Sequence, residues 1–309
     1  MPYMLSCDST TDLTLAQYAA LDLHYVSLHF LLDGKEYPDD YGQSLPMKTF
    51  FDAMAAGATT GTSQVTTGEF ELYFRQFLEQ GSDILHVSLS SGLSGCYHSA
   101  CAARDMLLEE FPERKIIVVD SLCGSGGAAI LMLEAARQRD AGRTMEETAA
   151  WIEARRLHVH HWLFTPELAY FVRGGRVSAA AGWIGTLLRL CPVIEANCEG
   201  KLIPREKIRG KQRALRVLVE KMVSYAEGGM AYDGPCHISH ADNLADAEQL
   251  AGMIEEKFPQ LRGKIVINTV GTTLGSHCGP GMVALFFYGT ERGRSEEHTS
   301  ELQSRIDIS

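Results

Sequence analysis

Hydroxyl side chains and glycines are concentrated in five loops of this sequence. Hydroxyl groups and loop amides at the start of a helix donate hydrogen bonds to negatively charged oxygens, and the helix dipole favours an anion there. Glycine lets the backbone approach a ligand closely. The pattern therefore predicts an anion-binding site. The five loops are Asp8–Asp12, Thr59–Gln64, Ser88–Gly95, Asp120–Gly127 and Gly271–Gly281.

Helix capping is the simpler interpretation of the same residues. A Ser, Thr or Asp side chain before a helix accepts hydrogen bonds from the free amides of the first turn, and this needs no ligand. Any one of the loops alone favours capping. Ligands of α/β proteins bind where loops meet at the carboxyl ends of the strands. Several such loops at one sheet edge therefore leave capping and a shared anion site as open alternatives.

A serine-dependent lipid hydrolase is the enzymatic alternative. Ser94 could act as the nucleophile and His277 as the base, with Asp8 or Asp12 orienting the imidazole. However, residues 92–96 read G-L-S-G-C, which lacks the second glycine of the G-x-S-x-G nucleophile elbow. The hydrolase remains the second hypothesis.

Two further patterns could indicate a cofactor or a metal. Gly124–Ala129 fits the G-x-G-x-x-A dinucleotide fingerprint, but the preceding four residues separate it from the predicted strand, so the tight turn is missing. We expect small residues at a helix start instead. His158, His160 and His161 have no nearby Cys or carboxylate to complete a metal site. We expect partly exposed histidines on a strand, and neither a cofactor nor a metal.

Apolar runs alternate with amphipathic segments, which predicts an α/β fold with mainly parallel sheets. The boundary is expected near residues 157–165, giving an N-terminal α/β domain over 1–160 and a C-terminal α/β domain over 161–293. Extended segments are predicted at Met4–Cys7, Val26–Leu32, Lys35–Tyr37, Ile84–Leu89, Ile116–Val119, Trp162–Phe164, Val193–Ala196, Lys201–Lys207, His237–His240, Ile265–Val270 and Val283–Tyr288. Helices are predicted at Glu69–Leu78, Ser94–Phe111, Ala128–Asp140, Met145–Arg156, from Pro166 onward, Ala179–Leu190, Lys211–Ala226 and Leu244–Phe258.

The charge and the ends of the sequence limit its partners. With 28 Lys and Arg against 39 Asp and Glu, the formal net charge is −11, which disfavours sequence-independent nucleic-acid binding. No signal segment is recognisable, and no stretch approaches the roughly 20 apolar residues of a membrane span. Eight singly placed cysteines without a C-x-x-C pair favour reduced thiols. We therefore expect a soluble cytoplasmic protein.

Residues 294–309 differ from the rest of the chain. The segment from Arg294 to Arg305 resembles the translation of a common sequencing adapter and has no apolar periodicity. We interpret 294–309 as a non-native tail, expect it to be disordered, and exclude it from the predicted domains.

Short motifs occur in a fixed order up to about residue 292. They are Asp8–Leu13, Thr62–Gln64 with Gly68–Phe70, Ser90–Gly95 with Tyr97, Val119–Ser121, Gly174–Ser178, Gly200–Leu202, Arg209–Lys211 and Gly275–Gly281. Together they resemble the DegV family of bacterial fatty-acid-binding proteins. The resemblance implies two α/β domains with a fatty acid buried between them.

The resemblance also implies which side chains hold the ligand. The residues that it places around the carboxylate are Thr62, Ser63, Ser91, Ser94 and His277. Arg176 matches a further family position, near the head group or at a partner surface. Candidate walls of the acyl tunnel are Phe164, Phe171, Trp183, Ile184, Leu187, Leu188 and Phe286.

Members of the family are similar to the carrier subunit of a bacterial fatty-acid kinase. Such a carrier is not a catalyst; it presents the carboxylate to a separate ATP-dependent subunit that makes an acyl phosphate. The basic run Lys201–Arg216 would then contact an acidic partner or, transiently, an anionic membrane surface, with a solvated surface as the alternative. Val65-Thr66, Ser276 and Cys278 depart from frequent family residues, which leaves the preferred acyl length open.

Overall fold

The structure is a computed structural model that describes residues 3–178 and 190–293. Its first sheet, the parallel sheet, has the strand order β2-β1-β6-β7 with parallel neighbours throughout. β1 is buried along its whole length, as expected for a strand whose sheet is covered on both faces. The strands are β1 (Tyr3–Asp8), β2 (Leu23–Val26), β6 (Asp83–Ser88) and β7 (Ile116–Asp120).

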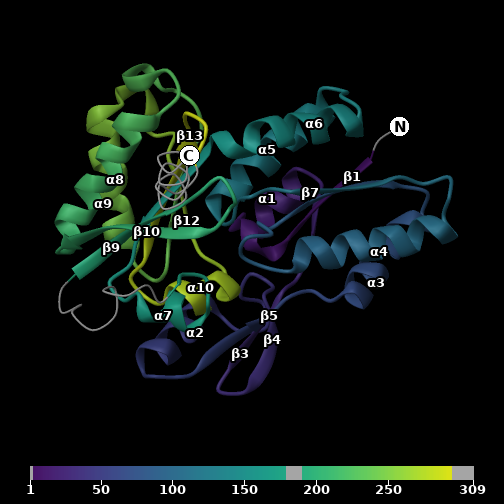
Figure 1. Ribbon diagram of the computed structural model, residues 1–309, viewed down its shortest axis with the longest axis horizontal. Coiled ribbons are helices and arrows are strands. Elements are labelled where there is room, and N and C mark those ends of the chain that lie inside the picture. The colour runs from purple at the N-terminus through teal and green to yellow at the C-terminus, as the bar shows by residue number, and fades with distance from the viewer. Residues whose placement is uncertain (1–2, 179–189, 294–309) are drawn as a thin grey trace, which may run out of the picture.

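Helices cover both faces of the parallel sheet (Figure 1). Phe70 and Phe74 of α3 and Leu107 of α4 pack on the face that presents Ile84 and Ile116. α5 packs on the other face and also contacts the second large sheet, so one apolar core extends across both halves of the chain. The elements are η1 (Ser9–Thr11), α1 (Leu15–Ala20), α3 (Thr67–Leu78), α4 (Cys96–Glu110), α5 (Gly126–Asp140), α6 (Met145–Arg155) and η2 (Arg156–His158).

The second large sheet, the mixed sheet, has the order β10-β9-β8-β13-β11-β12. Only β11 and β12 pair in parallel, and every other neighbouring pair is antiparallel. The prediction of mainly parallel sheets is therefore wrong here. A parallel pair needs a crossover connection, which α9 supplies between β11 and β12, whereas β9 and β10 form a hairpin and β13 inserts between β8 and β11. The strands are β8 (Val159–Phe164), β9 (Leu190–Ala196), β10 (Leu202–Arg209), β11 (Cys236–His240), β12 (Val266–Thr269) and β13 (Val283–Tyr288).

α8 and α9 flank the mixed sheet on its outer side (Figure 1). The predicted helix start at Pro166 is wrong, because the next helix begins at Ala169. The predicted helix Ala179–Leu190 lies almost wholly outside the described residues. No described helix is long and apolar enough to span a membrane. The elements are α7 (Ala169–Arg173), α8 (Lys211–Tyr225), η3 (Gly229–Ala231), α9 (Leu244–Lys257), η4 (Pro259–Leu261) and α10 (Thr272–Cys278).

A small antiparallel sheet, in the order β4-β3-β5, lies beside α10 (Figure 1). The single strand predicted over Val26–Leu32 is wrong, because the chain leaves the parallel sheet after β2 and enters the small sheet at β3. Phe50 and Phe51 of α2 pack against Gly275 of α10. The elements are β3 (His29–Leu32), β4 (Lys35–Pro38), α2 (Met47–Ala55) and β5 (Thr60–Ser63).

Candidate functional site

A mostly apolar cavity lies between the carboxyl ends of the parallel sheet and one face of the mixed sheet. The space holds about 880 Å³ free of protein atoms, a volume that includes its open mouth. The apolar residues on its wall include Leu28, Leu89, Leu93, Leu163, Phe171, Leu202, Met282 and Phe286.

One part of the cavity wall is polar. Thr62 of β5 and His277 of α10 both lie on it, and the Oγ1 atom of Thr62 is 2.8 Å from Nε2 of His277. Ser94, which precedes α4, and Arg176, which follows α7, complete this polar group. Polar residues from four separate segments therefore lie on the wall of the same mostly apolar cavity.

Two buried carboxylates hold the start of α10, the helix that carries His277. Asp39 accepts hydrogen bonds from the amides of Thr272 (3.2 Å) and Thr273 (3.1 Å). Asp12 accepts one from the amide of Gly271 at 2.9 Å. Burial raises the pKa of both carboxyl groups, that of Asp12 to about 7. Capping by these side chains fixes the position of α10.

His277 is neutral at pH 7 in this environment. Burial is the main cause that lowers its pKa to about 4, and the positive charge of Arg176 acts in the same direction. Its Nδ1 atom is buried and has no hydrogen-bond partner among the described residues. An uncharged imidazole can contribute one hydrogen-bond donor and one acceptor to the site.

Ser94 lies in the loop that leads into α4. Its hydroxyl oxygen accepts from the amide of Cys96 (3.3 Å), and its proton is donated to the Cys96 Sγ atom (3.2 Å). The loop packs closely on Gln64, because a Cβ atom on Gly95 would lie 2.2 Å from the Gln64 side-chain oxygen. The predicted Thr62–Gln64 and Ser90–Gly95 motifs are therefore neighbours.

Arg176 connects two of the predicted motifs. Its Nε donates to the carbonyl of Leu93 at 2.9 Å, and its Nη1 donates to the carbonyl of Gly174 at 2.6 Å. The guanidinium thus joins the serine-rich loop to the Gly-Gly-Arg segment while lying on the cavity wall.

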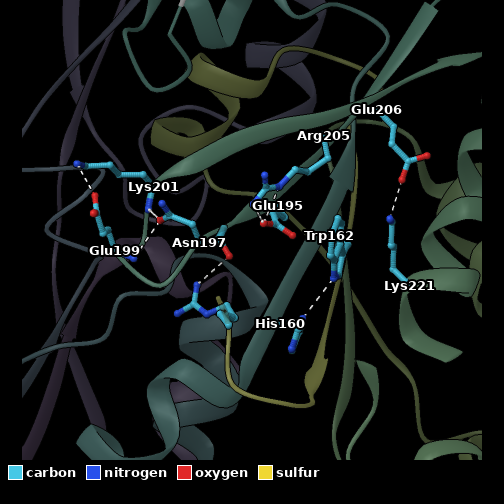
Figure 2. Close-up of polar contacts among 11 residues, drawn as sticks. His160, Trp162, Glu195, Asn197, Glu199, Lys201, Arg205, Glu206 and Lys221 are labelled. Atoms are coloured by element: carbon cyan, nitrogen blue, oxygen red, sulfur yellow. Dashed lines mark hydrogen bonds and ion pairs between the residues drawn. The ribbon is translucent and has the colours of Figure 1, made fainter. Parts of the chain in front are cut away.

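The turn between β9 and β10 forms another part of the wall, through Ala196, Gly200 and Leu202. Figure 2 shows how Asn197 shapes this turn: its side-chain oxygen accepts hydrogen bonds from the amides of Glu199 and Lys201, each at 3.0 Å. The carbonyl of Gly200 then accepts from a residue of the serine-rich loop.

Two of the predicted carboxylate ligands, Ser63 and Ser91, make other polar contacts. Ser63 lies on the cavity wall, but its hydroxyl donates to Glu36 at 3.1 Å. Ser91 is not among the residues that line the cavity, and its amide donates to Asp120 at 3.1 Å. The predicted residues that line the cavity are Thr62, Ser63, Ser94, Arg176 and His277, and of these Thr62 and His277 lie within hydrogen-bonding distance of each other.

The predicted tunnel walls are partly correct. Phe171 and Phe286 line the cavity. Phe164 does not, because side chains alternate along a strand and Leu163 of β8 is the neighbour that faces the cavity. The remaining predicted wall residues lie outside the described part of the chain, namely Trp183, Ile184, Leu187 and Leu188.

A hydrolytic triad is not assembled. A base in such a triad needs a carboxylate at its second ring nitrogen, but no described residue bonds to Nδ1 of His277. The carboxylate of Asp8 instead accepts from the amide of Leu89 at 2.7 Å, and Asp12 is engaged at α10 as described above. The hydrolase hypothesis loses its geometric basis.

Packing and burial account for the residues behind the dinucleotide and metal alternatives. Gly126 and Gly127 begin α5. A Cβ atom on Gly126 would lie 2.7 Å from Phe286, and one on Gly127 would lie 2.2 Å from His161, so close packing explains both glycines. His160 and His161 are buried, contrary to the expectation of partial exposure. Among residues 3–178 and 190–293, no cluster of three or more metal-ligating side chains occurs.

Comparison with known proteins identifies the family. A family model described as "Uncharacterised protein, DegV family" matches residues 5–290. The chain belongs to the DegV family. A DegV domain-containing protein of Clostridium perfringens is 33% identical over 287 residues, which cover 93% of this chain and 97% of that relative.

Solved DegV structures share the fold. A fatty-acid-binding DegV family protein from Streptococcus agalactiae has 26% identity and a TM-score of 0.80, covering 94% of this chain and 100% of its own. The fatty acid kinase (Fak) B3 protein of Streptococcus pneumoniae, loaded with linoleic acid, has 23% identity and a TM-score of 0.79. The match covers 93% of this chain and 99% of the pneumococcal chain. At this identity the second likeness concerns the fold alone.

Sequence reasoning missed the residues that support the polar group of this DegV protein. Asp39 caps α10 from a turn after β4, and nothing in its neighbourhood in the sequence signals a partner more than two hundred residues away. Gly174 belongs to a motif that was recognised, but its contact with His277 requires the folded chain.

Proposed function

We propose that this chain binds a long-chain fatty acid, with the carboxylate at Thr62, Ser94 and His277 and the acyl chain in the apolar cavity. The observation that carries the proposal is one mostly apolar cavity whose wall includes hydrogen-bonding side chains, with Thr62 and His277 2.8 Å apart. The fatty-acid-binding relative from Streptococcus agalactiae supports the choice of ligand.

The energetics of the cavity suit such an amphiphile. Each CH₂ group buried against the apolar wall contributes roughly 0.8 kcal/mol. A buried carboxylate is costly unless hydrogen bonds replace its water. The Thr62 hydroxyl can supply one of these bonds, and the Ser94 hydroxyl can supply another when its proton turns away from Cys96 Sγ. Arg176 adds a nearby positive charge. A neutral apolar lipid would leave these polar groups unused.

We further propose that the chain is a non-catalytic carrier, from which a separate ATP-dependent kinase subunit takes the carboxyl group to form an acyl phosphate. The pneumococcal kinase B3 protein has the same fold, and Nδ1 of His277 has no carboxylate partner among the described residues. The basic residues of β10 and of the start of α8 are candidates for contacting that kinase or, transiently, an anionic membrane.

Binding can be tested by titration with oleate and with oleyl alcohol, which differ in the head group. We expect oleate to bind at least ten-fold more tightly, and Thr62→Val to remove most of this preference, because a hydrogen bond to a charged group contributes about 1.5–3 kcal/mol. Thr269→Val, at an exposed position of β12, is the control. Equal affinity for the acid and the alcohol would refute carboxylate recognition.

Transfer to a kinase can be tested separately. Reversing the charges at Lys207, Arg209 and Lys211 should leave fatty-acid affinity unchanged and slow acyl-phosphate formation by the kinase subunit. A control variant reverses the charges of three other exposed basic residues in the part of the chain that forms the mixed sheet, namely Lys257, Arg262 and Lys264. Equal rates for the two triple variants would refute docking through β10 and α8.

A further inference from the structure

Gly174 lies directly against the ring of His277. A Cβ atom at this position would be 2.1 Å from Nδ1 and 2.8 Å from Cε1 of the imidazole, closer than real Cβ atoms approach. The backbone angles of Gly174 are φ −74° and ψ −7°, which any residue adopts. The glycine is therefore required by the contact with the ring and not by the conformation of the chain.

The two ring nitrogens of His277 have different surroundings. Nε2 faces the hydroxyl of Thr62 at 2.8 Å. Nδ1 is buried against Gly174 and has no partner among the described residues. In a neutral imidazole one nitrogen carries the proton and the other accepts. A proton on Nδ1 would be a buried donor without an acceptor and would point at the backbone of Gly174, whereas a bare nitrogen fits there.

We infer that Gly174 fixes His277 as the tautomer protonated on Nε2, and thereby sets the direction in which the Thr62 hydroxyl donates. Nε2 then donates its proton to the Thr62 oxygen. The hydroxyl proton of Thr62 cannot point back at His277 and is available to an anionic oxygen in the cavity. Gly174 is a positioning residue in this account. His277 takes part in carboxylate binding by orienting the Thr62 hydroxyl, which donates to the ligand.

The opposite tautomer would disfavour an anion. If Nε2 accepted the proton of Thr62, the hydroxyl would present only its lone pairs to a carboxylate in the cavity. The tautomer therefore decides whether this end of the cavity attracts or repels an anionic head group. The inference rests on the proposed fatty-acid site for its functional meaning, but the tautomer itself is a property of the protein without ligand.

The tautomer is measured directly by long-range ¹H–¹⁵N NMR of ¹⁵N-labelled protein at neutral pH, with His277→Ala used to assign the signals. We expect a protonated Nε2 and an unprotonated Nδ1 before oleate is added. A protonated Nδ1, or two tautomers in similar amounts, would overturn the inference. Since no ligand is required, this outcome is independent of whether oleate binds.

Variants test the functional consequence. Gly174→Ala keeps the backbone conformation accessible but displaces the ring, so oleate affinity should fall at least ten-fold. In a His277→Ala background, Gly174→Ala should cause no further loss of oleate affinity. If the losses of affinity from the two changes add, the inference is overturned. Gly252→Ala in α9, where a Cβ atom meets nothing within 4 Å, is the matched control. His277→Gln, which can place an amide donor near the Nε2 position, should retain more affinity than His277→Asn.

Discussion

The hydroxyl of Ser90 donates a 2.9 Å hydrogen bond to the carbonyl of Gly200, across 110 residues of sequence. The contact leaves no room for side chains: a Cβ atom on Gly200 would lie 2.0 Å from the Ser90 oxygen, and one on Gly92 would lie 2.6 Å from the Glu199 carbonyl. The β9–β10 turn therefore packs closely against the loop that carries Ser94. This contact joins the two halves of the chain beside the cavity, whose wall includes Gly200.

Ser90→Ala should weaken the contact between the β9–β10 turn and the serine-rich loop. The buried carbonyl of Gly200 loses its side-chain donor, which costs about 1–3 kcal/mol of stability. Bound fatty acid should dissociate several-fold faster, because the turn separates more easily from the loop. Stopped-flow transfer of a fluorescent fatty acid to albumin measures this rate. Ser91→Ala is the control, since Ser91 does not line the cavity. Equal dissociation rates for the two variants would show that the Ser90–Gly200 contact does not retain the fatty acid.

The carboxyl group of Asp12 should give the protein a specific pH dependence. Burial is the largest cause that raises its folded-state pKa to about 7, above the roughly 3.9 of an unfolded chain. The folded state then binds more protons between these values, so this contribution to the free energy of unfolding falls as pH rises from about 4 to about 7.

Asp12→Asn removes the titrating group but keeps a side-chain oxygen near the amide of Gly271. The free energy of unfolding of the variant relative to the wild type should therefore increase between about pH 5 and about pH 8. Urea unfolding at several pH values measures the difference. Asp233→Asn, at an exposed position, corrects for general charge effects. A relative stability that stays constant with pH would show that Asp12 does not titrate in this way.

Asp39→Ala should disturb α10. The variant removes the acceptor of the amides of Thr272 and Thr273, and loss of a capping side chain costs about 0.5–2 kcal/mol. Because α10 carries His277, fatty-acid affinity should also fall, and His277 NMR signals should shift. Asp40→Ala, one residue along in the same turn, serves as the comparison. Native affinity in Asp39→Ala, despite reduced stability, would argue against support of the site.

The account also predicts chemical inertness at Ser94. A fluorophosphonate probe should not label this residue at a rate above that of other surface hydroxyls, because His277 has no carboxylate partner at Nδ1 among the described residues. Mass spectrometry of tryptic peptides measures the labelling. Stoichiometric modification at Ser94, lost in His277→Ala, would restore the hydrolase hypothesis.

Local patterns predicted most elements but not how the strands pair. The predicted helix Glu69–Leu78 corresponds to α3 (Thr67–Leu78), and the predicted extended segment Lys35–Tyr37 corresponds to β4 (Lys35–Pro38). Pairing partners depend on tertiary packing. The insertion of β13 between β8 and β11, antiparallel to both, has no local signal.

The site could be predicted to the extent that its residues belong to recognisable motifs. Thr62, Ser94 and His277 came from the family resemblance, and the fold places all three on one cavity. Ser63 shares a motif with Thr62, but alternation along β5 turns its hydroxyl to Glu36. Asp39 was missed, because it acts on α10 through a contact that exists only in the folded chain.

Native mass spectrometry of the purified protein, followed by extraction of bound lipid, tests the central claim most directly. The account predicts a protein that carries one long-chain fatty acid, or takes one up when it is supplied. A folded Thr62→Ala/Ser94→Ala variant should have lost that ligand. A wild-type protein that is empty and unable to take up any fatty acid would contradict the account.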